Sequence, residues 1–184
     1  MPPSIRTVAV IGAGTAGRGF ALACAAAGFN VVLEDVMPSN LRRAEAEFAD
    51  LRASAGRLEL ALTVEAAVRE ADVAVDFVPD ELESKLEIFS LLDRMAPPKT
   101  ILMTPSEALS ITDLASCVYR PDRCVAVRGG LTGAGMVRVL YPAGVAEGTL
   151  AGVAEFLRTL GAEARMEADP DVPALMKNAG RAAV

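Results

Sequence analysis

A glycine-rich turn near the start of the chain has the residue types and spacing that suit a diphosphate. Val8–Ile11 is an apolar run, and Gly12, Gly14 and Gly17 follow it in a G-x-G-x-x-G pattern. The first glycine permits a tight turn, the second lets the backbone approach a pyrophosphate, and the third allows helix and strand to pack closely. A helix that begins near Thr15 would add free N–H groups and the positive end of its dipole.

An acidic residue follows the second apolar run, Asn30–Glu34. Asp35 stands where its carboxylate can accept hydrogen bonds from the hydroxyls of an adenosine ribose. The same carboxylate would repel a 2′-phosphate, so the pattern favours NAD over NADP. A glycine turn without a nucleotide is the alternative, but strand, turn, helix and acid together indicate a dinucleotide site. The residues predicted to bind this half of the cofactor are Gly12, Ala13, Gly14, Thr15, Ala16, Gly17 and Asp35.

The chain contains no histidine among its 184 residues. The commonest general acid–base group and the commonest imidazole metal ligand are therefore missing. Cys24, Cys117 and Cys124 lack C-x-x-C spacing, so we expect reduced, buried thiols rather than disulfides or a metal site. With no signal peptide ahead of the first strand, these thiols favour a cytoplasmic protein.

The composition suits one compact α/β domain, residues 1–184. Hydrophobic residues make up 52% of the chain, enough for one substantial core. The net charge is −6 and no basic run is present, so we expect no nucleic-acid partner. The alanine-rich run at 21–27 is too short to span a membrane, and no membrane association is expected.

Short apolar runs alternate with helical patterns along most of the chain. Because most of the runs are continuously apolar, they indicate a parallel sheet that is covered on both faces. The alternation predicts an α/β fold, a doubly wound and mostly parallel sheet of the Rossmann type, with a ligand crevice at the carboxyl ends of its strands. The expected strands are Thr7–Ile11, Asn30–Glu34, Glu59–Leu62, Val73–Phe77, Thr100–Met103, Cys124–Arg128, Met136–Leu140 and Ala162–Met166.

The helical segments differ in their expected exposure. Apolar residues at helical spacing predict a packed helix over Leu82–Leu92. Thr149 is expected to cap a helix that ends at Gly161. Residues 40–55 are charged and alanine-rich, which predicts a solvated surface helix. Residues 171–184 are expected to form a short terminal helical segment.

Several segments together resemble the NAD-binding domain of 3-hydroxyacyl-CoA dehydrogenases, and the resemblance runs almost from end to end. That family joins a Rossmann-type domain to a C-terminal helical domain, and it oxidises the 3-hydroxyl of an acyl-CoA with NAD, as in fatty acid metabolism. The segments that carry the resemblance are Val8–Gly19, Val31–Val36, Ala71–Lys85, Leu109–Ala115 and Arg120–Arg128.

The resemblance implies further contacts with the cofactor. Phe77, Val78 and Pro79 would leave the fourth strand beside the nicotinamide end of NAD. Asp80 stands where the family usually has a glutamate, and Lys85 matches the family's lysine near the cofactor. The alternative for Lys85 is an ordinary exposed lysine on a helix.

The family's catalytic residues are substituted in this chain. On the family's pattern, Arg128 stands in place of the catalytic histidine, Leu140 in place of the glutamate that orients it, and Glu107 in place of a substrate-binding serine. Leu131 replaces an asparagine, and Asn178 matches another asparagine of the family's site. An arginine stays protonated at useful pH and cannot act as the base, so the family's usual mechanism is unavailable.

Glu107 and Arg128 replace residues that meet each other in the family's active site. We therefore hypothesise that they form an ion pair beside the nicotinamide pocket. Two independent surface charges are the alternative.

The chain ends at Val184, where the family's helical domain would begin. In the family that domain closes over the acyl chain and supplies most of the dimer contact. Without it, apolar residues in Gly130–Val137 and Pro173–Val184 would lack cover, which favours a homo-oligomer through this region.

Three functions remain open from the sequence. The first is a 3-hydroxyacyl-CoA dehydrogenase-like oxidoreductase with weak or altered activity, on an acyl-CoA or a small hydroxy or keto compound. The second is a non-catalytic NAD(H)-binding module or subunit. The third is a scaffold whose fold persists without a ligand.

Overall fold

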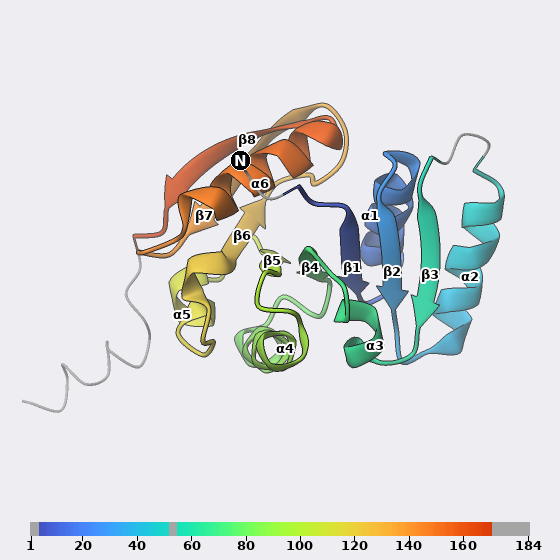
Figure 1. The fold of residues 1–184 in the computed structure, drawn as a ribbon, viewed down its shortest axis with the longest axis horizontal. Helices are drawn as coiled ribbons and strands as arrows, with labels where there is room; N and C mark the ends of the chain where they lie inside the picture. The colour runs from blue at the N-terminus through green and yellow to red at the C-terminus, as the bar shows by residue number, and fades with distance from the viewer. Residues whose placement is uncertain (1–3, 52–54, 171–184) are drawn as a thin grey trace, which may run out of the picture.

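The computed structural model describes residues 4–51 and 55–170. Their strands form one eight-stranded sheet in the order β3-β2-β1-β4-β5-β6-β7-β8 (Figure 1). The strands are β1 (Thr7–Ile11), β2 (Asn30–Glu34), β3 (Arg57–Ala61), β4 (Val73–Asp76), β5 (Ile101–Pro105), β6 (Cys124–Arg128), β7 (Gly135–Tyr141) and β8 (Ala162–Ala168). The α-helices are α1 (Thr15–Ala26), α2 (Pro38–Ala49), α3 (Val64–Val68), α4 (Leu82–Met95), α5 (Ile111–Ala115) and α6 (Glu147–Thr159), and a short 3₁₀ turn, η1, covers Pro121–Arg123.

The first six strands confirm the predicted doubly wound sheet. Every neighbouring pair among them is parallel. The strand order runs from β1 outward to β2 and β3 on one side and to β4, β5 and β6 on the other, so it reverses between β1 and β4. In sheets of this kind, ligands bind outside the carboxyl ends of the strands at this reversal point.

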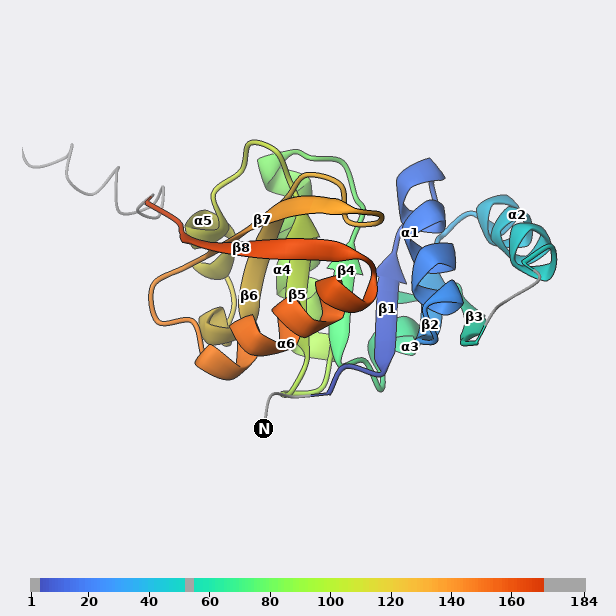
Figure 2. The same ribbon diagram turned by 90° about the horizontal axis from the view of Figure 1, so that it is seen from above.

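Helices cover both faces of the sheet, as the continuously apolar strands predict. On one face, α1, α2 and α6 pack with the side chains of Val8, Val10, Val125 and Val139. On the other face, α3, α4 and α5 pack with Ala9, Ala74 and Ala126. Figure 2 shows α6 beside β8, with α1 and α2 beside the β1–β3 half. Alternate residues of each strand therefore pack into two separate cores, one on each face of the sheet. The packing of both cores holds the ends of the strands in fixed positions relative to one another.

The seventh strand departs from the parallel pattern. β7 is antiparallel to β6, and Val139 lies opposite Val127 in their register. The two strands are joined by a short loop in which Gly129 and Gly133 have φ values of +103° and +92°. Residues other than glycine rarely adopt these backbone angles. A loop this short cannot contain the crossover helix that a parallel connection needs. β8 then pairs with β7 in parallel after α6.

Two predicted helix boundaries differ from the structure. α2 ends at Ala49 rather than continuing to residue 55. Thr149 does not cap α6: the helix begins at Glu147, and the buried Thr149 hydroxyl donates a hydrogen bond to the Asp122 carbonyl at 3.0 Å. The predicted end of α6 is confirmed, because Gly161 follows the helix with a φ of +90°.

The prediction of three buried thiols is wrong for one of them. Cys24 and Cys124 are buried, whereas Cys117 is exposed, and all three are free. Burial raises the pKa of the Cys24 and Cys124 thiols well above the usual range.

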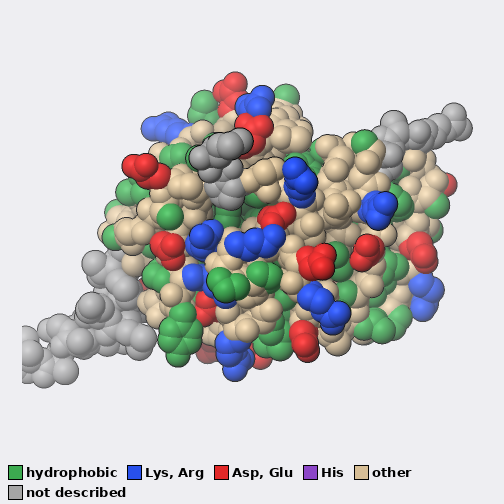
Figure 3. Space-filling model, viewed as in Figure 1, with side chains coloured by type: hydrophobic (Ala, Val, Ile, Leu, Met, Phe, Trp, Pro, Cys, Tyr) green, Lys and Arg blue, Asp and Glu red, His purple; other side chains and the backbone are tan. Residues whose placement is uncertain are grey.

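Gly130–Val137, one of the two segments expected to lack cover, is partly buried in the structure. Leu131 and Val137 are already buried, and in that segment Met136 stays 65% exposed. On the face in Figure 3, acidic and basic side chains are interspersed and apolar side chains form small groups. None of the helices within residues 4–51 and 55–170 is long and apolar enough to cross a membrane. The predicted terminal segment, 171–184, lies outside the described residues.

Candidate cofactor-binding site

The glycine turn joins β1 to α1 at the carboxyl end of the sheet, and its geometry explains each glycine. Gly12 has a φ of +98°, which favours glycine. A Cβ on Gly17 would lie 1.9 Å from the Gly12 carbonyl oxygen, so a side chain there cannot be accommodated. A Cβ on Gly14 would meet no atom within 4 Å. Gly12 and Gly17 therefore shape the turn, while the space above Gly14 is open to a ligand.

The N-terminus of α1 is available to an anion. Gly14 occupies the N-cap position without a side-chain hydrogen bond, and the first turn contains no acidic residue. Gly14, Thr15 and Ala16 are all exposed. The first N–H groups of a helix have no partner inside the helix, and they carry the positive end of its dipole. This end of α1 is thus suited to a diphosphate.

Asp35 lies at the end of β2, and its carboxylate connects β2 to the glycine turn. Oδ2 accepts hydrogen bonds from Ala13 N–H at 2.8 Å and from the Asn40 amide at 3.1 Å, and Oδ1 accepts one from Met37 N–H at 2.7 Å. Burial raises the pKa of Asp35, but the hydrogen bonds from Met37, Ala13 and Asn40 outweigh it, so the pKa lies below its usual value. The side chain is therefore an oriented anion, with lone pairs left for ribose hydroxyls.

These hydrogen bonds change the expected role of Ala13. Its N–H is used by Asp35 within the protein, so the free donors for a diphosphate come from the exposed Gly14, Thr15 and Ala16. Asn40, at the start of α2, was not predicted as a site residue. Its only sequence signal is a polar amide five positions after the acid.

Phe77 follows β4 and supports the glycine turn from behind. Its N–H donates to the Ile11 carbonyl at 2.7 Å, and its ring lies 5.3 Å from that of Phe20 on α1. Val78 is half-buried, whereas Pro79 and Asp80 are exposed at the carboxyl end of the sheet. Asp80 Oδ2 accepts a hydrogen bond from Glu107 N–H at 3.2 Å, which links the exits of β4 and β5. The predicted contacts of Phe77–Asp80 with nicotinamide stay predictions.

Lys85 is neither exposed nor isolated, so the alternative of an ordinary surface lysine is wrong. Its Nζ donates to Asp76 Oδ1 at 2.7 Å and to the Pro105 carbonyl at 3.1 Å, and it is 1% exposed. Asp76 ends β4, and the Thr104 hydroxyl lies next to the same carboxylate. Burial raises the pKa of Asp76, while the Lys85 charge opposes this rise. A direct contact between Lys85 and the cofactor stays a prediction.

The sequence analysis did not single out Asp76. A signal was present, because an acid at the end of the wholly apolar run Val73–Val75 is unusual for a strand that enters a core. The structure shows that this acid serves as the partner of Lys85, whose Nζ also binds the Pro105 carbonyl at the end of β5.

Glu107 and Arg128 lie close together but do not form the hypothesised ion pair. Glu107 Oε1 accepts a hydrogen bond from Gly129 N–H at 3.0 Å. The Arg128 guanidinium donates through Nη2 to the Leu109 carbonyl at 3.2 Å. Each charged group therefore binds the backbone beside the other residue, which the sequence could not reveal because these backbone groups belong to loops.

The other substituted positions offer no proton-transfer group. Leu140 is 3% exposed and packs in the core with Ala126, which lies opposite it in the register of β6 and β7. Leu131 is 9% exposed and packs in the other core. Asn178 lies outside the described residues. Beyond the ends of β4 and β5, Asp80 and Glu107 carry carboxylates, and a hydrogen bond from Glu107 N–H to Asp80 Oδ2 joins these two residues.

The fold and the glycine turn define a dinucleotide-binding domain of the Rossmann type. The open space at Gly14, the uncapped end of α1 and the oriented carboxylate of Asp35 fit the diphosphate and the adenosine ribose of NAD. A family model described as 3-hydroxyacyl-CoA dehydrogenase, NAD binding domain, matches residues 7–128. The chain belongs to this family, and its cofactor is NAD.

Individual relatives agree with this assignment. A probable 3-hydroxybutyryl-CoA dehydrogenase of Bacillus subtilis (strain 168) is 32% identical over 136 residues, which are 66% of this chain and 47% of the relative. The 5-formyl-3-hydroxy-2-methylpyridine 4-carboxylate 5-dehydrogenase of Mesorhizobium japonicum is 26% identical over 188 residues, covering 95% of this chain and 60% of the relative.

Among solved structures, (S)-3-hydroxybutyryl-CoA dehydrogenase PaaH1 from Ralstonia eutropha is similar with a TM-score of 0.80 at 25% identity. The match covers 90% of this chain and 64% of that chain. The chain thus spans about half the length of the curated relatives it matches.

Proposed function

We propose that this chain is the NAD-binding part of an oxidoreductase whose activity on 3-hydroxyacyl substrates is weak or altered. The observation that carries the proposal is Arg128 at the end of β6, where a base would be needed. NAD, when bound, accepts or supplies the hydride in the interconversion of an alcohol and a ketone. This chain's own residues must then handle the proton, and a protonated guanidinium cannot accept it.

The arrangement of β6 and β7 supports this reading. Arg128 lies opposite Arg138, and Leu140 lies opposite Ala126, so Leu140 is on the same face as Arg128 at the diagonal position. A base at 128 could be oriented from 140, but leucine forms no hydrogen bond. The loss of a positioned base typically lowers a rate by ~10²–10⁴-fold.

A restored pair of residues tests the proposal. We expect the native chain to oxidise NADH with acetoacetyl-CoA slowly or not at all, as measured by absorbance at 340 nm. Arg128→His with Leu140→Glu should raise the rate, and Arg128→His alone should raise it less because its imidazole lacks a partner. A native rate equal to that of the full-length relatives would contradict the proposal.

A non-catalytic NAD(H)-binding module or subunit is the second candidate, and the same substitutions favour it. Calorimetric titration with NADH separates it from a ligand-free scaffold. Binding with micromolar to millimolar affinity and no turnover on any hydroxy or keto compound would select the module. The absence of binding would reject both NAD-dependent functions.

The substrate, the assembly and the location are also proposals. An acyl-CoA and a small hydroxy or keto acid are both compatible with the family, and the Mesorhizobium relative is named for a carboxylate. We infer a cytoplasmic protein from its free thiols. A homo-oligomer through the segment that contains the exposed Met136 is a further proposal, and light scattering at high concentration tests it.

A further inference from the structure

Three arginines lie in a row across one face of the sheet. Arg128 on β6 is opposite Arg138 on β7, and Arg138 is opposite Arg165 on β8. Residues directly opposite one another in neighbouring strands point to the same face, so the three side chains form a line that starts at the carboxyl end of β6. Three adjacent positive charges need anionic partners.

Two of the three arginines have such a partner in the protein. Glu167 accepts hydrogen bonds from Arg138 Nε at 3.0 Å and Nη2 at 2.6 Å, and it forms an ion pair with Arg165 at 3.3 Å. Among the described residues, Arg128 forms no ion pair, although, alongside the hydrogen bond from Arg138, its charge contributes to lowering the pKa of Glu167. The Arg128 guanidinium donates a hydrogen bond to the Leu109 carbonyl. Its Nε is buried and has no hydrogen-bond partner among residues 4–51 and 55–170. A guanidinium with spare donors can bind a further group.

Arg128 ends β6, which lies on the side of the reversal point away from β2. The adenosine half of the cofactor belongs with Asp35 at the end of β2, so the nicotinamide half lies toward β4, β5 and β6. Ser106 N–H donates to the Val127 carbonyl at 3.1 Å, which places the exit of β5 beside Arg128. Glu107, the nearby acid, directs its carboxylate to Gly129 N–H.

We propose that Arg128 binds the carboxylate of a small hydroxy or keto acid beside the nicotinamide end of the cofactor. The inference rests on the proposed function and names its substrate class. Arginine stays charged, and its planar guanidinium matches the two oxygens of a carboxylate. Arg128 cannot accept a proton from the substrate, but it can select a substrate that carries a carboxylate and orient it.

The charges of the crevice favour a carboxylate over a phosphate. The Glu107 N–H donates to Asp80 Oδ2 at 3.2 Å, so a second carboxylate lies beside Glu107. The Glu107 carboxylate, bound to Gly129 N–H next to Arg128, repels a phosphate dianion more strongly than a monoanion. A single carboxylate group is therefore the better partner.

The experiment measures binding rather than turnover. Acetoacetate, 3-hydroxybutyrate, neutral methyl acetoacetate and inorganic phosphate are titrated calorimetrically into the full chain, with and without NADH. We expect the two acids to bind at least about tenfold more tightly than the ester and than phosphate. Arg128→Gln should weaken acid binding by a similar factor, and Arg128→Lys should weaken it less because the charge remains.

Arg158→Gln is the matched control. It removes the same charge from an exposed residue of α6, paired with Glu155, and should leave acid binding unchanged. Acid binding that is absent, equal to that of the ester, or unaffected by Arg128→Gln in a folded variant would overturn the proposal. Tighter binding of phosphate through Arg128 would overturn it in favour of a phosphate ligand. NADH affinity is recorded separately, so failure of the cofactor site is distinguished from failure of the acid site.

Discussion

Lys85 Nζ lies 2.7 Å from Asp76 Oδ1, and these side chains are 1% and 0% exposed. The pair joins α4 to the end of β4, and the Pro105 carbonyl extends the link to the end of β5. The exits of two neighbouring strands are thus fixed by one ammonium group. The predicted contacts of Phe77–Asp80 with nicotinamide depend on the position of these exits.

Removal of the Lys85 charge should destabilise the protein strongly. In Lys85→Met, Asp76 is left buried and without its cation, and loss of one partner of a buried ion pair costs about 3–5 kcal/mol. Urea unfolding gives the change in free energy. Lys99→Met is the matched control, because Lys99 pairs with Asp72 but is 59% exposed, and we expect a loss of at most about 1 kcal/mol.

The double variant Asp76→Leu with Lys85→Met separates the ion pair from the shape of the site. Replacement of both partners by apolar side chains removes the unpaired charge, so much of the stability lost in Lys85→Met should return. Equal destabilisation by the single and the double variant would show that the lost packing, rather than the unpaired carboxylate, dominates.

Two glycines of the same helix should respond in opposite directions to alanine. In Gly17→Ala the new Cβ would overlap the Gly12 carbonyl oxygen at 1.9 Å, so the turn must shift and stability should fall by about 1–3 kcal/mol or more. A Cβ on Gly19 meets no atom within 4 Å, and alanine should stabilise the exposed helix by about 0.5–1 kcal/mol. Equal responses in urea unfolding would contradict this account of the turn.

Much of the fold could be predicted because it depends on local patterns. The apolar runs place the eight strands to within a few residues, and the G-x-G-x-x-G spacing identifies the start of α1 and the need for glycine at positions 12 and 17. The antiparallel direction of β7 was not predicted. Its apolar run is similar to those of the parallel strands, and direction is decided by the connecting loop, whose glycines adopt positive φ.

Side-chain partners in the site were harder to predict, because they depend on contacts between distant elements. The position of Lys85 in the sequence suggests a surface or a cofactor contact, but the structure gives it Asp76 and Pro105 as partners. Glu107 and Arg128 have opposite charges, yet each binds a backbone group instead of the other. Residue type and spacing in the sequence predict where a site lies. The hydrogen bonds between its side chains and backbone groups depend on the conformation of the loops, which the sequence pattern does not give.

Asp35 should make stability depend on pH in the acid range. Its pKa in the folded protein lies below the unfolded value, because hydrogen bonds from Met37, Ala13 and Asn40 outweigh the effect of burial. Such a carboxylate contributes stability at pH values above its unfolded pKa, and the contribution is lost as the pH falls through the folded pKa. The free energy of unfolding should therefore fall below about pH 4.

Asp35→Asn should show a shallower fall over this range, as measured by urea unfolding at several pH values. The buried neighbour Glu34 acts in the opposite sense, since burial and the charge of Asp35 raise its pKa. Glu45→Gln, an exposed acid on α2, is the control and should follow the native curve. A curve for Asp35→Asn that runs parallel to the native one would contradict the role of these hydrogen bonds.

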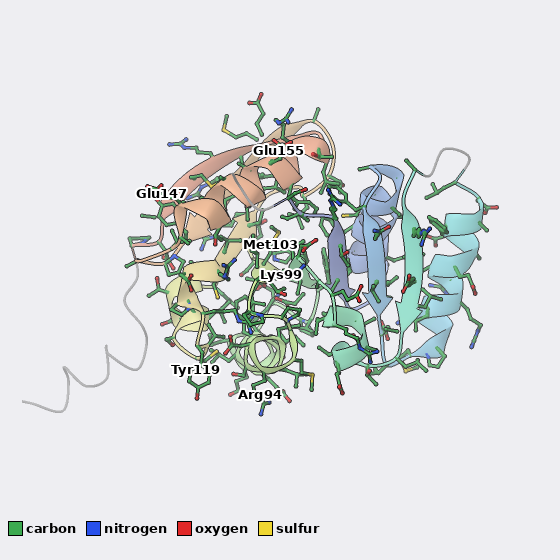
Figure 4. The ribbon with its side chains drawn as sticks, viewed as in Figure 1. Arg94, Lys99, Met103, Tyr119, Glu147 and Glu155 are labelled. Carbon is green, nitrogen blue, oxygen red and sulfur yellow. The ribbon has the colours of Figure 1, made fainter. Side chains whose placement is uncertain are left out.

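The three thiols should differ sharply in reactivity. Cys24 and Cys124 are buried and their pKa values are raised, so little thiolate forms and reagents have poor access. Cys117 is exposed. It lies in the segment that leads to Tyr119, whose side chain is 96% exposed and points away from the body of the protein (Figure 4).

Iodoacetamide should modify Cys117 in the native protein, and mass spectrometry of the peptides identifies the site. Cys117→Ser should leave the folded chain almost unmodified, while all three native thiols should react in denaturant. Rapid labelling of Cys24 or Cys124 in the native protein would contradict this expectation. It would mean that the core around α1 (Cys24) or β6 (Cys124) opens more readily than the burial of these residues implies.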